Sequence, residues 1–134
     1  MRRDADRPIP VRGSLRTIEY AVCANGSMPA KNFIEDLDES ELRRLDTLFR
    51  RMADTGRIHN RKQFKQVDGK VYEFKRYQTR VGCFQVGDRW RLTHGFVKKS
   101  DKWPKREIER ATRIMQEDLA RDDVARSKRR QGKR

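Results

Sequence analysis

The sequence predicts an α+β fold: a small antiparallel sheet of about four strands, covered by two N-terminal helices and followed by a C-terminal helix. Two patterns lead to this prediction. Apolar and polar residues alternate through residues 71–77 and 90–97, as in strands that have one face in a core. Between residues 42 and 52, apolar residues recur at steps of three and four, as on the buried face of a helix.

The N-terminal part of the chain gives the weakest signals. Residues 1–13 hold two of the four prolines and show no periodicity, so we expect a flexible lead. Alternation through residues 15–23 predicts a first strand. Ser27 and Pro29 then stand where the N-cap and the first turn of a helix belong, which predicts a short first helix.

The second helix has the clearest boundaries. Asp38 is followed three residues later by Glu41, the spacing of a capping box. Gly56 suits the left-handed residue at which helices end. We expect the apolar stripe of this helix to cover the sheet, and residues 57–68 to form a basic connection rather than a strand.

The sheet is centred on residues 71–97, which read as three consecutive strands. Gly87 and Asp88 supply a hairpin turn between the second and the third. Because successive side chains of a strand point to opposite faces, the pattern predicts an apolar face, which includes Trp90, and a basic face. His94 is four residues from Trp90 and is therefore expected on the same face, so we expect a buried, hydrogen-bonded histidine rather than a catalytic acid or base.

After the sheet, Pro104 opens a third helix whose apolar spacing lasts to Leu119. Residues 121–134 carry seven basic and two acidic residues and no apolar periodicity. We expect these residues to form a basic disordered tail, either merely solvated or in non-specific contact with RNA or a protein. The folded domain is therefore expected at residues 14–120.

The positive charge of the chain is concentrated in its sheet half. The formal net charge is +14 over 134 residues. Residues 57–105 hold fourteen Lys or Arg against four acidic residues, a net of +10, whereas residues 31–56 hold five against seven, a net of −2. A one-sided positive field favours a polyanion, most directly a nucleic acid, or else an acidic protein partner.

Metal, disulfide and membrane signals are weak. Cys23 and Cys83 are both predicted inside strands and form no metal-ligand spacing with the histidines, so we expect reduced packing residues and no metal or other cofactor. No window approaches the roughly 18 apolar residues of a membrane span. Residues 1–12 lack the apolar segment of an export signal. We therefore expect a cytoplasmic protein without a membrane partner.

Several motifs match those of a known group of toxins. They are the helix start at residues 27–37, Val-Tyr-Glu-Phe-Lys at 71–75, Arg80, and the long block Leu-Thr-His-Gly-Phe-Val-Lys-Lys at 92–99 that runs on to 104–111. On these motifs, residues 15–119 resemble the phage Gp49-like or HigB-like branch of the RelE/ParE toxin superfamily of type II toxin-antitoxin systems. The resemblance implies a RelE-like fold and, for the RelE and HigB branches, an endonuclease that cleaves mRNA in the ribosomal A site.

The implied reaction is metal-free attack of a ribose 2′-hydroxyl on the adjacent phosphate, which leaves a cyclic phosphate. It needs cations around the phosphate, a proton acceptor and a proton donor. The sequence is rich in cations but has few candidates for the acceptor and the donor. The resemblance implies that Arg80 clamps the phosphate in the transition state. Lys75 and Lys98 are the further catalytic candidates, with Lys75 standing where the family usually has arginine.

A second set of residues is expected to bind the RNA chain. Tyr77 shares a face with Lys75 and is suited to stack on a base. The full set is Arg76, Tyr77, Arg91, Lys99, Lys102, Lys62 and Lys65. Residues 81–84 read Val-Gly-Cys-Phe where relatives have an aromatic-rich strand, so one stacking or proton-transfer residue of the family pattern is missing.

Three functions stay open on the sequence. The first is a ribosome-dependent mRNA interferase, neutralised by a small antitoxin that we expect to be a helix-turn-helix protein. The second is a ParE-like, non-enzymatic poison of DNA gyrase. The third is a catalytically silent module that binds RNA or a partner. The cations at Arg80, Lys98 and Lys99 favour the first, because a gyrase poison does not need phosphate-binding cations on the sheet.

Overall fold

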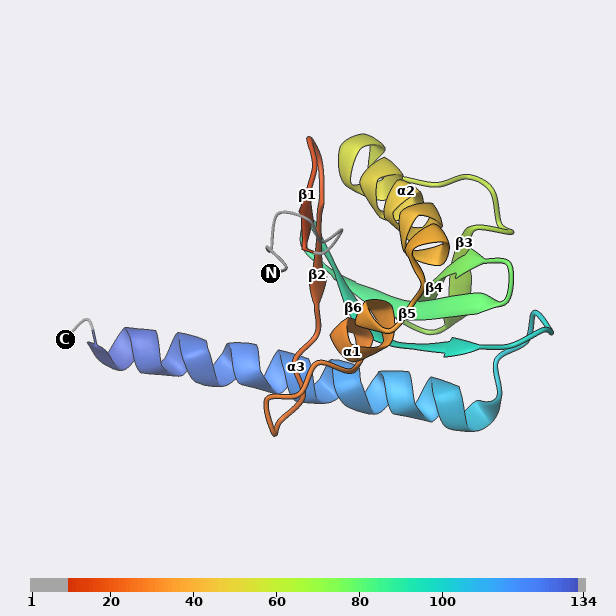
Figure 1. Cartoon of the computed structure of the whole chain (residues 1–134). Coiled ribbons are helices and arrows are strands. Elements are labelled where there is room, and N and C mark those ends of the chain that lie inside the picture. Colours follow the sequence, from red (N-terminus) through yellow and green to blue (C-terminus); the bar gives the residue numbers. More distant parts are fainter. Residues whose placement is uncertain (1–9, 133–134) are drawn as a thin grey trace.

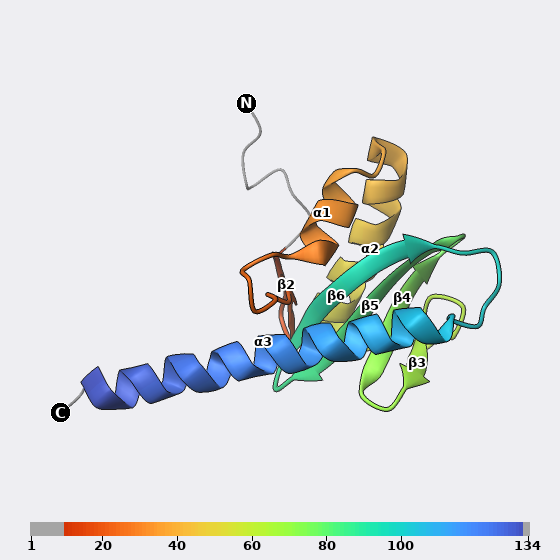
Figure 2. The ribbon, with the colours of Figure 1, turned by 90° about the horizontal axis from the view of Figure 1, so that it is seen from below.

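Within residues 10–132, which the computed structural model describes, the chain forms one six-stranded sheet and three helices. The strands are β1 (Val11–Arg12), β2 (Thr17–Tyr20), β3 (Phe64–Asp68), β4 (Val71–Arg76), β5 (Thr79–Val86) and β6 (Arg89–Val97), and the helices are α1 (Pro29–Glu35), α2 (Glu39–Thr55) and α3 (Lys105–Gly132). Helices α1 and α2 cover one face of the sheet and α3 crosses the other (Figures 1 and 2). The predicted α+β class is confirmed.

The sheet is larger than predicted and is not purely antiparallel. Its strand order is β1-β2-β6-β5-β4-β3, and β2 pairs with β6 in parallel. The prediction of about four antiparallel strands is therefore wrong in number and direction. Hairpin signals are local, whereas the β2–β6 pair joins segments that are separated by both N-terminal helices and three strands.

The two missed strands lie at the edges of the sheet. β3 falls in the predicted connection at residues 57–68, and β1 falls in the predicted lead at residues 1–13. An edge strand needs only one paired neighbour, so a short polar segment can form one without a clear apolar face. The rest of the predicted lead, residues 1–9, lies outside the described residues.

Helix α2 has the predicted ends and the predicted role. The Asp38 side chain accepts a hydrogen bond from the Glu41 backbone N–H at 2.8 Å, and Gly56 ends the helix with a φ of 81°. Leu48 and Phe49 are buried against the sheet, and the Phe49 ring meets that of Phe74 edge to face at 4.9 Å. This contact belongs to the larger of the apolar clusters.

The face of the sheet that was predicted to be basic is covered by α3. Ala111 and Ile114 of this helix are fully buried, and Ile114 packs with Phe84 of β5. Trp103, just before the helix, packs with Val71 of β4. The prediction of one oily and one basic face is wrong, because a second layer buries the polar side as well.

A bulge in β6 changes which side chains share a face. Val81 of β5 pairs with Gly95, and Cys83 pairs with Leu92, so β6 holds one residue more than β5 between these pairs. Side chains beyond the bulge switch faces. Trp90 lies in the core under α2, whereas the His94 ring meets Trp103 on the α3 side at 5.8 Å. The prediction that His94 shares a face with Trp90 is wrong for this reason.

Helix α3 is longer than the sequence pattern predicted. Its C-terminal turns extend past the sheet (Figure 1) and include residues 121–132, so the prediction of a disordered tail from residue 121 is wrong for these residues. No glycine or proline occurs between residues 105 and 131, and propagating a helix costs far less than nucleating one. The boundaries of the folded domain at residues 14–120 stay a prediction. None of the helices within residues 10–132 is both long and apolar enough to cross a membrane.

Gly95 allows α1 to approach β6. A Cβ atom on Gly95 would lie 2.1 Å from Cδ2 of the Phe33 ring. We predict that Gly95→Ala lowers the free energy of unfolding by about 1–3 kcal/mol, because overpacking forces the neighbouring ring to move. Urea denaturation of Gly95→Ala, Phe33→Leu and the double variant measures this effect. Additive losses in the double variant would contradict a direct clash.

Candidate nucleic-acid interface

Three segments meet at one end of the sheet, and all but one of the predicted site residues lie on them or on the strand ends beside them. They are the β4–β5 turn, the loop of residues 98–104 after β6, and residues 60–63 before β3. The Lys98 backbone N–H donates to the Gln78 carbonyl at 2.8 Å, and the Lys75 N–H donates to the Gln63 carbonyl at 2.8 Å. We call this region the cationic end, and its members are Arg44, Lys62, Lys65, Lys75, Arg76, Tyr77, Arg80, Lys98, Lys99, Asp101 and Lys102.

Tyr77 is an exposed aromatic at the tip of the β4–β5 turn. Its φ is 52°, a left-handed value that costs a non-glycine residue roughly 1–2 kcal/mol. The side chain is 69% exposed. The guanidinium carbons of Arg76 and Arg44 lie 4.8 Å and 5.3 Å from the ring centroid. Such a group of π surfaces and cations is suited to stack on an unpaired base.

Arg44 is a member of this group that the sequence analysis missed. It lies on the polar side of α2, where nothing in the sequence distinguishes it from the neighbouring exposed arginines. Only the packing of α2 over the sheet brings it to Tyr77.

Lys75 and Lys65 project beside each other from neighbouring strands and are each paired. Lys75 Nζ contacts the carboxylate of Asp101, and Lys65 Nζ lies 3.9 Å from Oε2 of Glu73. The hydrogen bond from Lys75, followed by the charges of Lys75, Lys65 and Arg80, holds the pKa of Asp101 below its usual range. Asp101, which the sequence analysis did not single out, is therefore part of the interface.

Arg80, the predicted phosphate clamp, is buried. Its side chain is 1% exposed and donates hydrogen bonds to the carbonyls of Tyr77, Thr79 and Ser100, the last at 3.1 Å. Arg80 Nε lies 3.9 Å from Oε1 of Glu73. This guanidinium ties the β4–β5 turn to the loop of residues 98–104, and its contact with a phosphate stays a prediction.

The remaining lysines of the cationic end are open to solvent. Lys62, Lys99 and Lys102 are exposed and Lys98 is half-buried. Within the described part of the chain, none of these four forms an ion pair. They can therefore meet an incoming phosphate without first losing a carboxylate partner.

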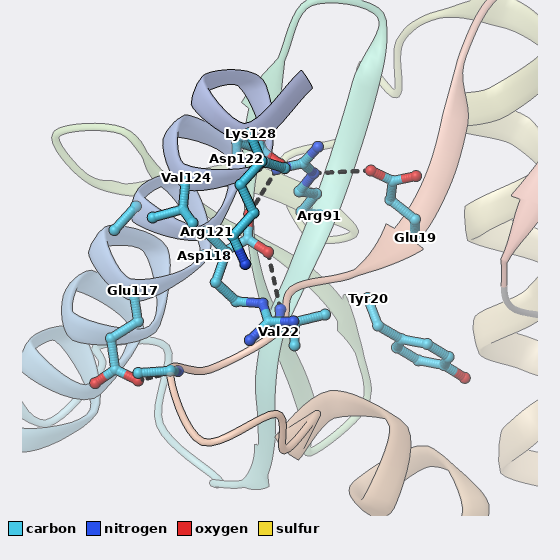
Figure 3. Close-up of a pocket in the computed structure, with 13 residues that line it drawn as sticks. Glu19, Tyr20, Val22, Arg91, Glu117, Asp118, Arg121, Asp122, Val124 and Lys128 are labelled. Atoms are coloured by element: carbon cyan, nitrogen blue, oxygen red, sulfur yellow. Dashed lines mark hydrogen bonds and ion pairs between the residues drawn. The ribbon is translucent and has the colours of Figure 1, made fainter. Parts of the chain in front are cut away.

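Arg91 does not belong to this group. It lies near the start of β6, whereas Lys98 follows the end of that strand. Its guanidinium donates to Glu19 at 2.7 Å and to Asp118 and Asp122 at 2.6 Å each (Figure 3). Burial alone lowers the pKa of Arg91, but the hydrogen bonds to these carboxylates raise it above its ordinary value. Arg91 thus fastens β6 to β2 and α3 and lines an open groove of about 830 Å³ beside them.

His94 is buried and hydrogen-bonded, as the sequence predicted. Its Nε2 lies 3.0 Å from Oε1 of Glu107, and its Nδ1 lies 3.2 Å from Oγ1 of Thr93. Burial lowers the pKa of His94 to about 4, although the hydrogen bond to Glu107 opposes this shift. The ring is therefore neutral at neutral pH and serves the packing of α3.

Both cysteines are buried in apolar clusters. Burial, followed by the charge of Glu73, raises the pKa of the Cys83 thiol, which disfavours a reactive thiolate. Within residues 10–132, no group of three or more His, Cys, Asp or Glu is arranged to hold a metal ion.

Comparison with protein families identifies the group to which the chain is similar. The model of the family described as phage-derived protein Gp49-like (DUF891) matches residues 32–116. This span runs from α1 into α3 and contains the whole cationic end. No curated protein matches the chain.

The buried neutral His94 makes stability depend on pH. Its pKa is about 4 in the folded protein against 6.5 for a free histidine, so the unfolded chain gains a proton first as the pH falls. We predict that the free energy of unfolding falls by roughly 2–3 kcal/mol between pH 6.5 and pH 4 through this residue. Denaturant titrations at several pH values should show this loss in the His59→Gln control, which keeps His94 and changes only an exposed histidine. A His94→Gln protein with the same pH dependence as the control would disprove it.

Proposed function

Because the chain belongs to the Gp49-like family of phage-derived proteins, part of the RelE/HigB-like toxin group, we propose that it is the toxin of a type II toxin-antitoxin pair and cleaves mRNA on the ribosome. The observation that carries this proposal is the cationic end, where four lysines without an ion pair among the described residues share one end of the sheet with the exposed Tyr77 ring, which Arg44 and Arg76 flank. Single-stranded RNA offers the matching chemistry, since it presents phosphates and unstacked bases together.

In the proposed complex, each part of the interface has a separate task. Lys98 and Lys99 neutralise phosphates that flank the cleaved bond, and the Tyr77 group stacks on a base and so holds the strand in register. The 2′-hydroxyl attacks the adjacent phosphorus and gives up its proton to solvent water, the bond to the 5′-oxygen breaks, and a cyclic phosphate remains. Nearby cations favour this step because negative charge builds on the phosphate as it reacts. The ammonium group of Lys98 is the proposed proton donor to the leaving 5′-oxygen.

The setting of the reaction follows from the same proposal. The protein acts in the cytoplasm, where it meets translating ribosomes, and it uses no metal. A cognate antitoxin, which we propose to be a small helix-turn-helix protein, neutralises it.

A second candidate is a module that binds RNA without cleaving it. The observation in its favour is the burial of Arg80, whose guanidinium is engaged with three backbone carbonyls rather than presented to a phosphate. The exposed lysines and Tyr77 would still bind a single strand in this case. A gyrase poison has no such support, because it leaves the unpaired lysines of the cationic end without a role.

We predict that the double variant Lys98→Ala/Lys99→Ala loses message cleavage by at least about tenfold, since each lysine removed weakens phosphate contact. Primer extension on a reporter message in a translating extract maps the cuts. The wild-type protein should cut in frame, and blocking translation should abolish the cuts. The matched control is Arg121→Ala/Lys128→Ala, which removes two exposed cations of α3 far along the helix from the loop.

Each other outcome has a definite meaning. Equal cutting by both double variants would rule out Lys98 and Lys99 as the phosphate-binding pair. An intact message that still binds the wild-type protein would favour the non-cleaving module. An intact message without binding, together with loss of supercoiling by gyrase, would favour the gyrase poison.

A further inference from the structure

The carboxylate of Asp101 lies at a point where cations of three strands converge. Lys75 of β4 and Arg80 of β5 are cross-strand partners, and Lys65 of β3 is the partner of Glu73, two residues before Lys75. Alternate residues share a face, so these three cations project on the same side of the sheet. Asp101 contacts Lys75 directly.

Arg80 also holds Ser100, the residue before Asp101. Arg80 Nη2 donates to the Ser100 carbonyl at 3.1 Å. The nearby carboxylate of Glu73 is fully buried, and its oxygens lie 3.9 Å from Lys65 Nζ and 3.9 Å from Arg80 Nε. Glu73 also accepts a hydrogen bond from the Trp103 indole at 2.7 Å. Glu73 is therefore a fixed part of the fold, whereas Asp101 is 72% exposed on a loop.

We propose that Asp101 occupies the site at which a phosphate of the RNA binds, so that the loop of residues 98–104 blocks this site in the free protein. The inference rests on the proposed function and adds to it an internal competitor of the substrate. The Asp101 carboxylate stands in for a phosphate oxygen, and Lys75, supported by Lys65 and Arg80, is the phosphate-binding group that it covers.

The contact is suited to exchange. Exposed ion pairs are weak because solvent screens them, whereas a phosphate brings further oxygens and releases bound counterions when it binds. The backbone on either side of Asp101 is anchored, by the bond from Arg80 to the Ser100 carbonyl and by the buried Trp103, so the exchange needs only a rotation of the exposed Asp101 side chain away from Lys75. The hydrogen bond from Lys75, followed by the charges of Lys75, Lys65 and Arg80, lowers the pKa of Asp101, as expected where these three cations converge.

Binding of a non-cleavable RNA tests the inference. The probe is a fluorescent single-stranded oligonucleotide with 2′-methoxy groups, and polarisation at constant salt gives its Kd. Asp101→Asn should bind about three to ten times more tightly than the wild type, because the competing carboxylate is lost. The control is Asp88→Asn, which removes the same charge from an exposed residue in the β5–β6 turn, at the opposite end of the sheet. This control should change Kd less than about twofold. Equal tightening in both variants would overturn the inference.

Inorganic phosphate gives a readout that does not depend on RNA binding. Phosphate binding is followed by NMR of the Lys75 side chain and, in every variant, of the backbone amides of residues 98–102. Phosphate should bind Asp101→Asn more tightly than the wild type, and adding Lys75→Met should abolish this gain. A Lys75 signal that phosphate leaves unshifted in both proteins contradicts the site. If phosphate behaves as expected while no oligonucleotide binds, the proposed function fails, whereas Asp101 still covers a phosphate-binding site. If the oligonucleotide binds but Asp101→Asn and Asp88→Asn do not differ, the inference fails and the function stands.

Discussion

The buried carboxylate of Glu73 is the constraint on which the rest of this structure depends. It is fully buried between the sheet and α3, where an unpaired charge would cost several kcal/mol. Arg80 and Lys65 supply the opposite charge, and Trp103 supplies a hydrogen bond at 2.7 Å. This requirement explains why a guanidinium and an indole lie together beside Glu73 under α3.

The same requirement shapes the cationic end. Arg80 lies beside Glu73 without a hydrogen bond from its Nε, and its Nη1 and Nη2 groups donate instead to the carbonyls of Tyr77, Thr79 and Ser100. The bond to Tyr77 helps to hold the β4–β5 turn in its left-handed conformation, and the bond to Ser100 draws the loop of residues 98–104 against the sheet. Positioning of Tyr77 and Asp101 is therefore a consequence of core electrostatics, and a change at Arg80 acts on the site through the fold.

Local patterns predicted the elements that depend on local chemistry. The capping of α2 by Asp38, its end at Gly56 and the strands β4, β5 and β6 all follow from the residues themselves. Sequence patterns gave wrong predictions where contacts with residues far along the chain determine the structure. Alternation assumes one residue per step, so it could not show the bulge that turns His94 toward α3. It also places the charged residues of a strand in solvent, and only the position of α3 shows that Arg80 is buried.

For the candidate site, the charge of the sheet half is the basis for proposing a polyanionic ligand, but it overstates the number of cations free to bind one. Arg91 is neutralised by carboxylates of β2 and α3, and Lys65 is engaged with Glu73. The cations that a nucleic acid can reach are those at the β4–β5 turn and the loop of residues 98–104. Lys75 is intermediate, because its partner Asp101 is exposed while the partners of Arg91 are tied to helix and strand. Whether a cation of this protein serves the fold or the ligand thus depends on how exposed the carboxylate opposite it is.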